Sequence, residues 1–487
     1  MSPSDKPITH KTISSARAYA FISIFSQIIS WGFTFWVIRL LNPEDYGLMA
    51  MASVMTGFMH IFSQLGFGAG VIQKKSVSIN DLSSLFWFSI FVGLVMSGVV
   101  FFVADFNAAI FGIPDLVPVT QLISILFVIS AVATVPRGHM SRHYMFKDIA
   151  KVNLVAAMIS SIASVIFAYM GFGVYTLILS SIILELTSSL GFLYKANWLP
   201  SMHFNHRELK PYLKFGLTLS VADAFTKLLT TLDKLIVGKL FAATQLGFYS
   251  TARNLSTMPI NKISPLINSI IFPILSRWQN DHGKSTDLYL KVLVYYLLII
   301  SPIYIGGILL GDDLILFVLG EKWEPVSFMF RIFCWVSMFE VLASYHKVLV
   351  TSRGMVKSIF WYNLLMMFFL IVSITYAANV SIQRIMYVWA IVYPLFTFMW
   401  IVKTSKDVKL TYSGYFLSIF KGIAASIVMV VTLLLTKYIL IPEFFQNEGL
   451  AVKLGIQIMV AILAYVAVLY FFQKKLVSDA LITLRAK

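Results

Sequence analysis

Residues 211–240, PYLKFGLTLSVADAFTKLLTTLDKLIVGKL, and residues 246–275, LGFYSTARNLSTMPINKISPLINSIIFPIL, are two membrane-length stretches with charged side chains among apolar ones. An Asp, Lys or Arg at the centre of a membrane helix costs about 2.5–3.5 kcal/mol. We therefore expect these groups to face protein or a water-filled cavity instead of lipid. The two stretches indicate a membrane protein with a polar interior.

The charges in these stretches follow helical spacing. Asp223, Lys227, Thr230 and Lys234 stand at i, i+4, i+7 and i+11, which is one face of a helix. The next stretch carries a similar polar stripe: Arg253, Thr257, Asn261, Ser264 and Asn268. Two mostly cationic stripes inside a bilayer predict a site for an anionic ligand. The alternative is that the charges pair with one another and only hold the helices together.

The composition excludes an ordinary soluble globule, since 59% of residues are hydrophobic and 12% charged. We predict about fourteen apolar spans, each long enough for a hydrocarbon core of about 30 Å. They lie near residues 17–41, 46–72, 82–104, 116–136, 152–170, 173–194, 211–240, 246–275, 288–310, 325–350, 357–378, 382–402, 415–440 and 452–472. The hydrophilic start lacks the features of a removable signal peptide, so the first helix is expected to be retained.

The net charge of +16 orients the chain in a membrane and does not indicate a nucleic-acid partner. With a cytoplasmic N-terminus, about 25 of the 38 Lys and Arg residues fall in cytoplasmic loops and tails, while the outer loops are richer in Asp and Glu. This positive-inside pattern predicts that both termini are cytoplasmic. The single cysteine, Cys334, excludes an intrachain disulfide.

The predicted fold is an all-α polytopic membrane protein with two six-helix lobes that repeat each other and two further C-terminal helices. The first lobe is expected at residues 1–195, a cytoplasmic linker at 196–210 and the second lobe at 211–402. Residues 403–487 would form the last two helices and a cytoplasmic tail.

The two lobes look like repeats offset by 200 residues, because Arg39–Gly47 aligns with Lys239–Gly247. In both segments a helix ends on a cation, a short outer loop follows, and a glycine opens the next helix. Repeats of even span number share one orientation, and ligand sites in such folds lie near the midplane between the lobes. The same offset aligns three further pairs: Gln27 with Lys227, Thr34 with Lys234, and Ser53 with Arg253.

Six segments with this order and spacing resemble the polysaccharide flippases of the multidrug/oligosaccharidyl-lipid/polysaccharide exporter superfamily, most closely the colanic-acid and O-antigen type. They are Arg39–Gly47, Leu65–Lys75, Ile113–Pro118, Asp233–Gly238, Leu246–Arg253 and Val318–Trp323. The resemblance implies fourteen helices in two lobes plus two, in the bacterial inner membrane. It also implies transport of an undecaprenyl-diphosphate-linked oligosaccharide. Related lipid flippases often carry arginines in the first helix, where this chain has Gln27.

Lys227, Lys234 and Arg253 are the candidates for binding the diphosphate, because arginine chelates phosphate oxygens bidentately and lysine acts as a point charge. Neutralisation by Asp223 or Asp233 is the alternative. The residues expected to line the cavity are Gln27, His60, Gln64, Asp223, Thr230, Thr257 and Asn261. Glu185 and Glu340 are candidates for ion or proton coupling, although a hydrogen-bonded structural carboxylate is an alternative for each.

Rival functions are a drug/cation antiporter of the same superfamily, or a membrane enzyme that polymerises or ligates lipid-linked glycan. An antiporter would want acidic residues along its cavity, and an enzyme a sizeable periplasmic domain. The sequence shows no nucleophile elbow, P-loop or metal-spaced His/Cys cluster. We therefore expect a monomeric transporter without enzymatic activity or cofactors. Its expected partners are the lipid-linked oligosaccharide, membrane lipids and polysaccharide polymerase machinery.

Overall fold

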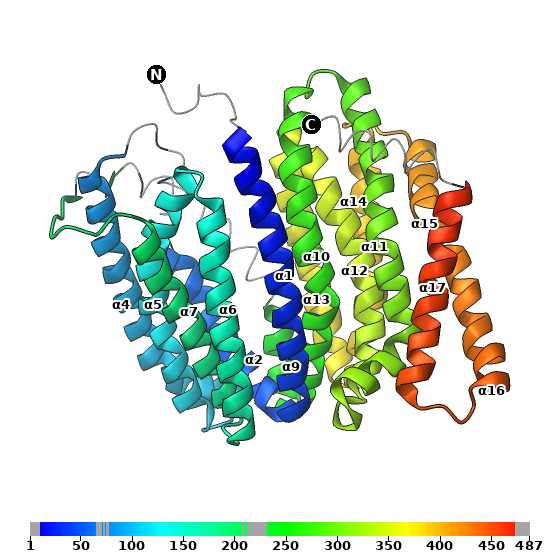
Figure 1. Ribbon diagram of the computed structural model, residues 1–487, viewed down its shortest axis with the longest axis horizontal. Helices are drawn as coiled ribbons and strands as arrows, with labels where there is room; N and C mark the ends of the chain where they lie inside the picture. The colour runs from blue at the N-terminus through cyan, green and yellow to red at the C-terminus, as the bar shows by residue number, and fades with distance from the viewer. Residues whose placement is uncertain are drawn as a thin grey trace. The chain divides into compact units, whose positions relative to one another are not determined.

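The computed structural model describes residues 10–64, 71, 74, 77–206, 209–210, 212 and 231–472, and these contain helices and turns but no strand (Figure 1). The α-helices are α1 His10–Leu40, α2 Pro43–Gln64, α4 Ile79–Phe111, α5 Leu116–Arg142, α6 Phe146–Tyr169, α7 Val174–Lys195, α9 Leu232–Leu240, α10 Ala243–Arg277, α11 His282–Leu319, α12 Val326–Ser352, α13 Val356–Ala378, α14 Ile382–Ser405, α15 Tyr412–Leu435, α16 Ile441–Phe444 and α17 Leu450–Phe472. Two short segments differ in type: a 3-10 turn at Glu321–Trp323 and a π-helical turn at Thr436–Leu440.

Eleven helical segments in the described part of the chain are long and apolar enough to cross a membrane. The predicted all-α polytopic class is confirmed. Every predicted span except 211–240 coincides with a described helix, and of that span only the end, α9, is described. Helices suit a bilayer because they satisfy their own backbone hydrogen bonds where no water is available.

Helix α4 shows how local sequence sets the ends of a span. The Ser78 hydroxyl accepts a hydrogen bond from the Asp81 backbone N–H, and the Asp81 carboxylate accepts one from the Ser78 N–H, both at 3.0 Å. This capping box satisfies two donors that the first turn leaves open. At the other end Gly112 takes a left-handed conformation with φ of 68°, which ends the helix.

The predicted repeat is visible at its first connection. Helix α1 ends at Leu40 and α2 begins at Pro43, while α9 ends at Leu240 and α10 begins at Ala243. Two residues break the helix in both cases, and the offset of 200 residues is the same at each boundary. Similar local sequence therefore gives the same helix–break–helix geometry twice.

The first turns of α2 and α10 cross in a reciprocal backbone contact. A Cβ added to Gly47 would lie 1.8 Å from the Ala243 carbonyl oxygen, and one added to Gly247 would lie 1.8 Å from the Pro43 carbonyl oxygen. The four residues are related in pairs by the repeat offset. Small residues let membrane helices approach to backbone contact, and here only glycine fits at both positions.

A second matching pair of turns joins α5 to α6 and α12 to α13. Tyr144 and Gly354 both have positive φ, 56° and 71°, and each precedes a methionine that caps the next helix. Glycine takes this conformation without steric cost, whereas tyrosine is strained in it. The turn is thus a shared feature of the repeat that two different residues occupy.

The chain divides into two compact units, a first unit of Met1–Gly247 and a second unit of Phe248–Lys487. In the first unit α5 packs on both α4 and α7, and α6 packs on α1 and α7. The segment after α7 folds back on α4: the Trp87 indole N–H donates to the Ser201 carbonyl at 2.8 Å, and the Ser201 N–H donates to the Ser83 hydroxyl at 3.1 Å. Part of the predicted linker, residues 196–210, is therefore held against the first unit.

In the second unit α11 packs on α12 and α15, and α14 packs on α12 and α13. Its core contains stacked tyrosines, with the Tyr289 and Tyr345 rings 4.7 Å apart. The imidazole of His346 is fully buried there, with Nε2 2.7 Å from the Thr404 hydroxyl. This histidine, which stands near Glu340 in sequence, belongs to the packed core of the second unit.

Candidate functional site

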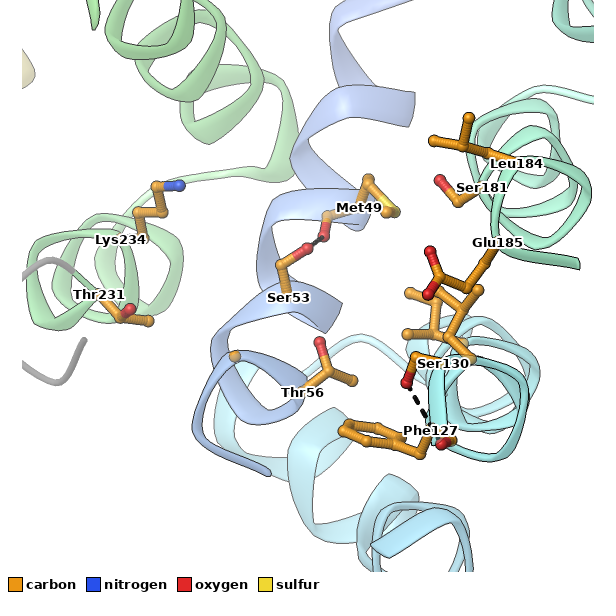
Figure 2. A pocket seen from close by; sticks show the side chains of 13 residues that line it. Met49, Ser53, Thr56, Phe127, Ser130, Ser181, Leu184, Glu185, Thr231 and Lys234 are labelled. Atoms are coloured by element: carbon orange, nitrogen blue, oxygen red, sulfur yellow. Dashed lines mark hydrogen bonds between the residues drawn. The ribbon is translucent and has the colours of Figure 1, made fainter. Parts of the chain in front are cut away.

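A polar pocket lies inside the first unit among α2, α5, α7 and α9 (Figure 2). Its volume is about 350 Å³. It is lined by Met49, Ser53, Thr56, Gly57, Ile123, Leu126, Phe127, Ser130, Ser181, Leu184, Glu185, Thr231 and Lys234. Ser53, Ser130 and Glu185 stand near the middle of their helices, so the pocket lies near the depth of the bilayer centre.

Lys234 and Glu185 reach this pocket from two different helices. Figure 2 shows Lys234 with Thr231 on α9, on one side of α2, and Glu185 with Ser181 on α7, on the other side. Asp233, the predicted neutralising neighbour, is buried and is not among the lining residues. The pocket thus holds one candidate diphosphate ligand and one candidate coupling carboxylate, which the sequence analysis treated separately.

Four hydroxyl groups of the pocket donate to the backbone of their own helices. Ser53, Thr56, Ser130 and Ser181 each hydrogen-bond a carbonyl oxygen three or four residues earlier, at 2.6, 3.2, 3.3 and 2.7 Å. A hydroxyl has one proton to donate and two lone pairs that accept. These side chains therefore offer the pocket acceptor oxygens, with their protons already engaged.

Arg253 and Glu340 form an ion pair inside the second unit, between α10 and α12. Their side chains are 16% and 14% exposed. The guanidinium carbon lies 5.1 Å from the centre of the Phe333 ring and 5.2 Å from that of Trp389, and the Ser337 hydroxyl donates to the Glu340 carboxylate. Two candidates from different categories are therefore partners of each other.

This pair bears on the alternative in which the charges hold helices together. Arg253 does have an acidic partner, but it is Glu340 on α12, and not Asp223 or Asp233. Further along the same helix, the Ser264 hydroxyl hydrogen-bonds the buried Tyr296 hydroxyl. The predicted α10 stripe thus makes contacts within the core of its own unit at both positions.

The remaining candidates are distributed as follows. Thr257 donates its hydroxyl to the Arg253 carbonyl at 2.9 Å, Asn261 is exposed, and Gln27 is half-buried on α1. His60 and Gln64 lie on α2, but their side chains fall outside the described residues, as do Asp223, Lys227 and Thr230 entirely. No group of three or more His, Cys, Asp or Glu side chains within the described ranges is placed to hold a metal ion.

Sequence reasoning missed the hydroxyl residues Thr56, Ser130 and Ser181. Serine and threonine are common in membrane helices, where they often bond their own backbone, so single occurrences carry little signal. Placing them at one pocket requires the packing of α2 with α5 and α7, which helical periodicity does not provide.

A family model and several known proteins resemble this chain over most of its length. The family described as polysaccharide biosynthesis protein matches residues 36–328. Lipopolysaccharide biosynthesis protein WzxC of Escherichia coli (strain K12) is 24% identical over 378 residues, covering 77% of this chain and 76% of the relative. Teichuronic acid biosynthesis protein TuaB of Bacillus subtilis (strain 168) is 24% identical over 374 residues, covering 75% and 76%.

Among solved structures, lipid II flippase MurJ in an inward closed conformation has a similar fold, with a TM-score of 0.69. The superposition covers 94% of this chain and 99% of that one, at 14% sequence identity. At this identity the similarity concerns the fold, and it matches the all-helical architecture described above.

Proposed function

Because this chain belongs to the polysaccharide biosynthesis protein family, we propose that it is a flippase for an undecaprenyl-diphosphate-linked oligosaccharide, and not an enzyme. It would move this lipid from the cytoplasmic to the periplasmic leaflet by alternating access, for the synthesis of a surface polysaccharide. Two curated relatives are named for lipopolysaccharide and teichuronic acid biosynthesis, and a structural relative is named as a lipid II flippase. These names support the proposal.

We propose Lys227, Lys234 and Arg253 as the cations that receive the diphosphate. The observation that carries this assignment is Lys234, whose side chain lines a polar pocket at bilayer depth. An ammonium group in such a site attracts phosphate oxygens more strongly than it would in water. Arg253 is compensated by Glu340 in this conformation, so it would contact phosphate only after that ion pair opens.

Direction of transport follows from charge. A diphosphate with roughly two negative charges that moves outward across an inside-negative membrane gains about 2.3 kcal/mol per charge per 100 mV. We propose an inner-membrane location with both termini cytoplasmic, a monomeric state and lobes at residues 1–195 and 211–402. The linker would be 196–210, and residues 403–487 would add two helices and the tail. Polysaccharide polymerase machinery is the proposed protein partner.

The test is export of glycan to the cell surface in a strain whose only flippase is this chain. Lys234→Met should lose most export, because it removes the charge and keeps the length of the side chain. Lys239→Met is the matched control: Lys239 is exposed at the end of the same helix and does not line the pocket. The amount of protein in the membrane is measured in parallel.

Full export by Lys234→Met would remove Lys234 from the diphosphate site. Full export by the triple variant Lys227→Ala/Lys234→Ala/Arg253→Ala, at normal abundance, would remove the site altogether. Topology is checked separately with reporter fusions near Lys403 and Asp312, which should report cytoplasm and periplasm respectively.

A further inference from the structure

The pocket of the first unit has two chemically different ends. At the α9 end Lys234 presents an ammonium group, which has three donors and no acceptor. At the opposite end Glu185 presents a carboxylate, which accepts only when ionised. The hydroxyls between them and around Glu185 direct their protons to helix carbonyls, so they also present acceptors.

A bare diphosphate does not match this arrangement. It suits the Lys234 end, but its oxygens are acceptors and would meet acceptor oxygens of Ser130 and Ser181 and the like charge of Glu185. A complementary ligand has an anionic group at one end and several hydrogen-bond donors at the other. A sugar attached to a phosphate has this pattern, because its hydroxyl and acetamido groups donate hydrogen bonds.

The size of the pocket limits how much of the ligand enters. A volume of about 350 Å³ lies at the lower end of the range of about 300–1,000 Å³ that is typical of small-molecule sites. It suits a ligand of small-molecule size and not a whole oligosaccharide chain. Phe127, Met49 and Leu184 supply apolar surface for the C–H faces of a sugar ring.

We propose that this pocket binds the sugar directly attached to the diphosphate, with the phosphate at Lys234 and the sugar donors at Glu185, Ser130, Ser181 and Thr56. The proposal rests on the flippase function proposed above and adds a specificity-determining site to it. A bare metal cation is a poorer match, because a hard cation needs six to eight oxygens converging at about 2.3–2.6 Å. The pocket oxygens instead come from separate helices around a much larger space.

The experiment compares two probes on the purified full chain in nanodiscs: undecaprenyl diphosphate and undecaprenyl-diphospho-N-acetylglucosamine. Wild type should bind the glycosylated probe more tightly, by about ten- to hundredfold, since hydrogen bonds to a charged group are the strong ones. Glu185→Gln should lose most of this difference and bind undecaprenyl diphosphate at least as well as wild type. Ser181→Ala should lose a smaller part.

The matched control is Glu443→Gln, which makes the same change at an exposed glutamate far from the pocket in sequence and should keep the full difference. Melting temperatures of all variants confirm folding. Equal binding of the two probes by wild type, or an undiminished difference in Glu185→Gln, would overturn the sugar site. A sodium-dependent affinity that is lost in Glu185→Gln, with no preference between probes, would also overturn it and assign the acceptor wall to a cation.

Lys234→Met distinguishes this proposal from the proposed function. If it weakens binding of both probes while Glu185→Gln changes neither, the diphosphate site stands and the sugar site fails. If Lys234→Met weakens neither probe, the diphosphate assignment itself fails.

Discussion

Gly247→Ala is the sharpest test of the contact between α2 and α10. The added methyl carbon would lie 1.8 Å from the Pro43 carbonyl oxygen and 3.2 Å from the Gly47 nitrogen. Cβ atoms essentially never approach within 3.0 Å, so the two backbones must separate by at least 1.2 Å, the difference between 3.0 and 1.8 Å. The obstructing atoms belong to the backbone, and no side chain can rotate away to make room.

The magnitude follows from comparison with a glycine in open space. Overpacking costs about 1–3 kcal/mol. Gly98→Ala, in α4, is the control, because a Cβ there meets nothing within 4 Å. It should stabilise the protein by about 0.5–1 kcal/mol through helix propensity. Thermal unfolding of the purified protein should therefore place Gly247→Ala about 2–4 kcal/mol below Gly98→Ala.

The double variant Gly47→Ala/Gly247→Ala tests the reciprocity of the contact. One separation of the helices relieves both clashes, so the two destabilisations should be clearly less than additive. Additive losses would mean that the two glycines act independently. A Gly247→Ala protein as stable as Gly98→Ala would refute the close crossing itself.

Four further predictions concern single interactions. Glu340→Gln leaves the half-buried charge of Arg253 without its carboxylate and should lower stability by about 3–5 kcal/mol, measured by thermal unfolding; the double variant Arg253→Met/Glu340→Gln should recover much of it, and no recovery would contradict a direct pair. Ser78→Ala removes the cap of α4 and should cost about 1 kcal/mol in the same assay. Tyr144→Gly relieves a positive φ and should stabilise by about 1–2 kcal/mol, whereas an unchanged melting temperature would show that the turn is unstrained. Hydrogen bonds from the side chain and backbone of a nearby lysine lower the pKa of Asp281, so its contribution to stability is present above the usual pKa of the group and is lost as pH falls through the lowered value; the difference in melting temperature between wild type and Asp281→Asn should thus vanish in strong acid, and a difference that grows there would contradict the sign.

The helices and their class could be predicted from the sequence because each span is a continuous apolar stretch of membrane length. Their ends could not, as α11 shows: the predicted span is 288–310, but the helix runs from His282 to Leu319. Hydropathy reports the part of a helix that matches the hydrocarbon core. The additional turns begin at a local cap, where the Asp281 carboxylate accepts a hydrogen bond from the Lys284 N–H at 3.1 Å.

The candidate site was predictable residue by residue but not in its groupings. Charge within an apolar stretch singled out Lys234, Glu185, Arg253 and Glu340 correctly as unusual. Which of them meet depends on helix packing: Lys234 shares a pocket with Glu185, and Arg253 pairs with Glu340 across 87 residues of sequence. Helical periodicity gives the face of one helix and contains no information about the helix that faces it.

The repeat offset predicted more than composition did. Aligning Arg39–Gly47 with Lys239–Gly247 anticipated the helix boundaries on both sides of each connection. It did not anticipate that the two glycines contact each other's helix. That contact depends on how the repeats are arranged in space, which an alignment does not describe.

The central claim, that this chain moves a lipid-linked glycan across a membrane, is tested most directly in proteoliposomes. The lipid probe is a fluorescent undecaprenyl-diphospho-N-acetylglucosamine, and a membrane-impermeant quencher reports the fraction in the outer leaflet over time. Wild type and Lys239→Met should equilibrate the probe between leaflets much faster than protein-free vesicles, and Lys234→Met should slow this exchange strongly. Exchange by wild type no faster than in protein-free vesicles would contradict the account.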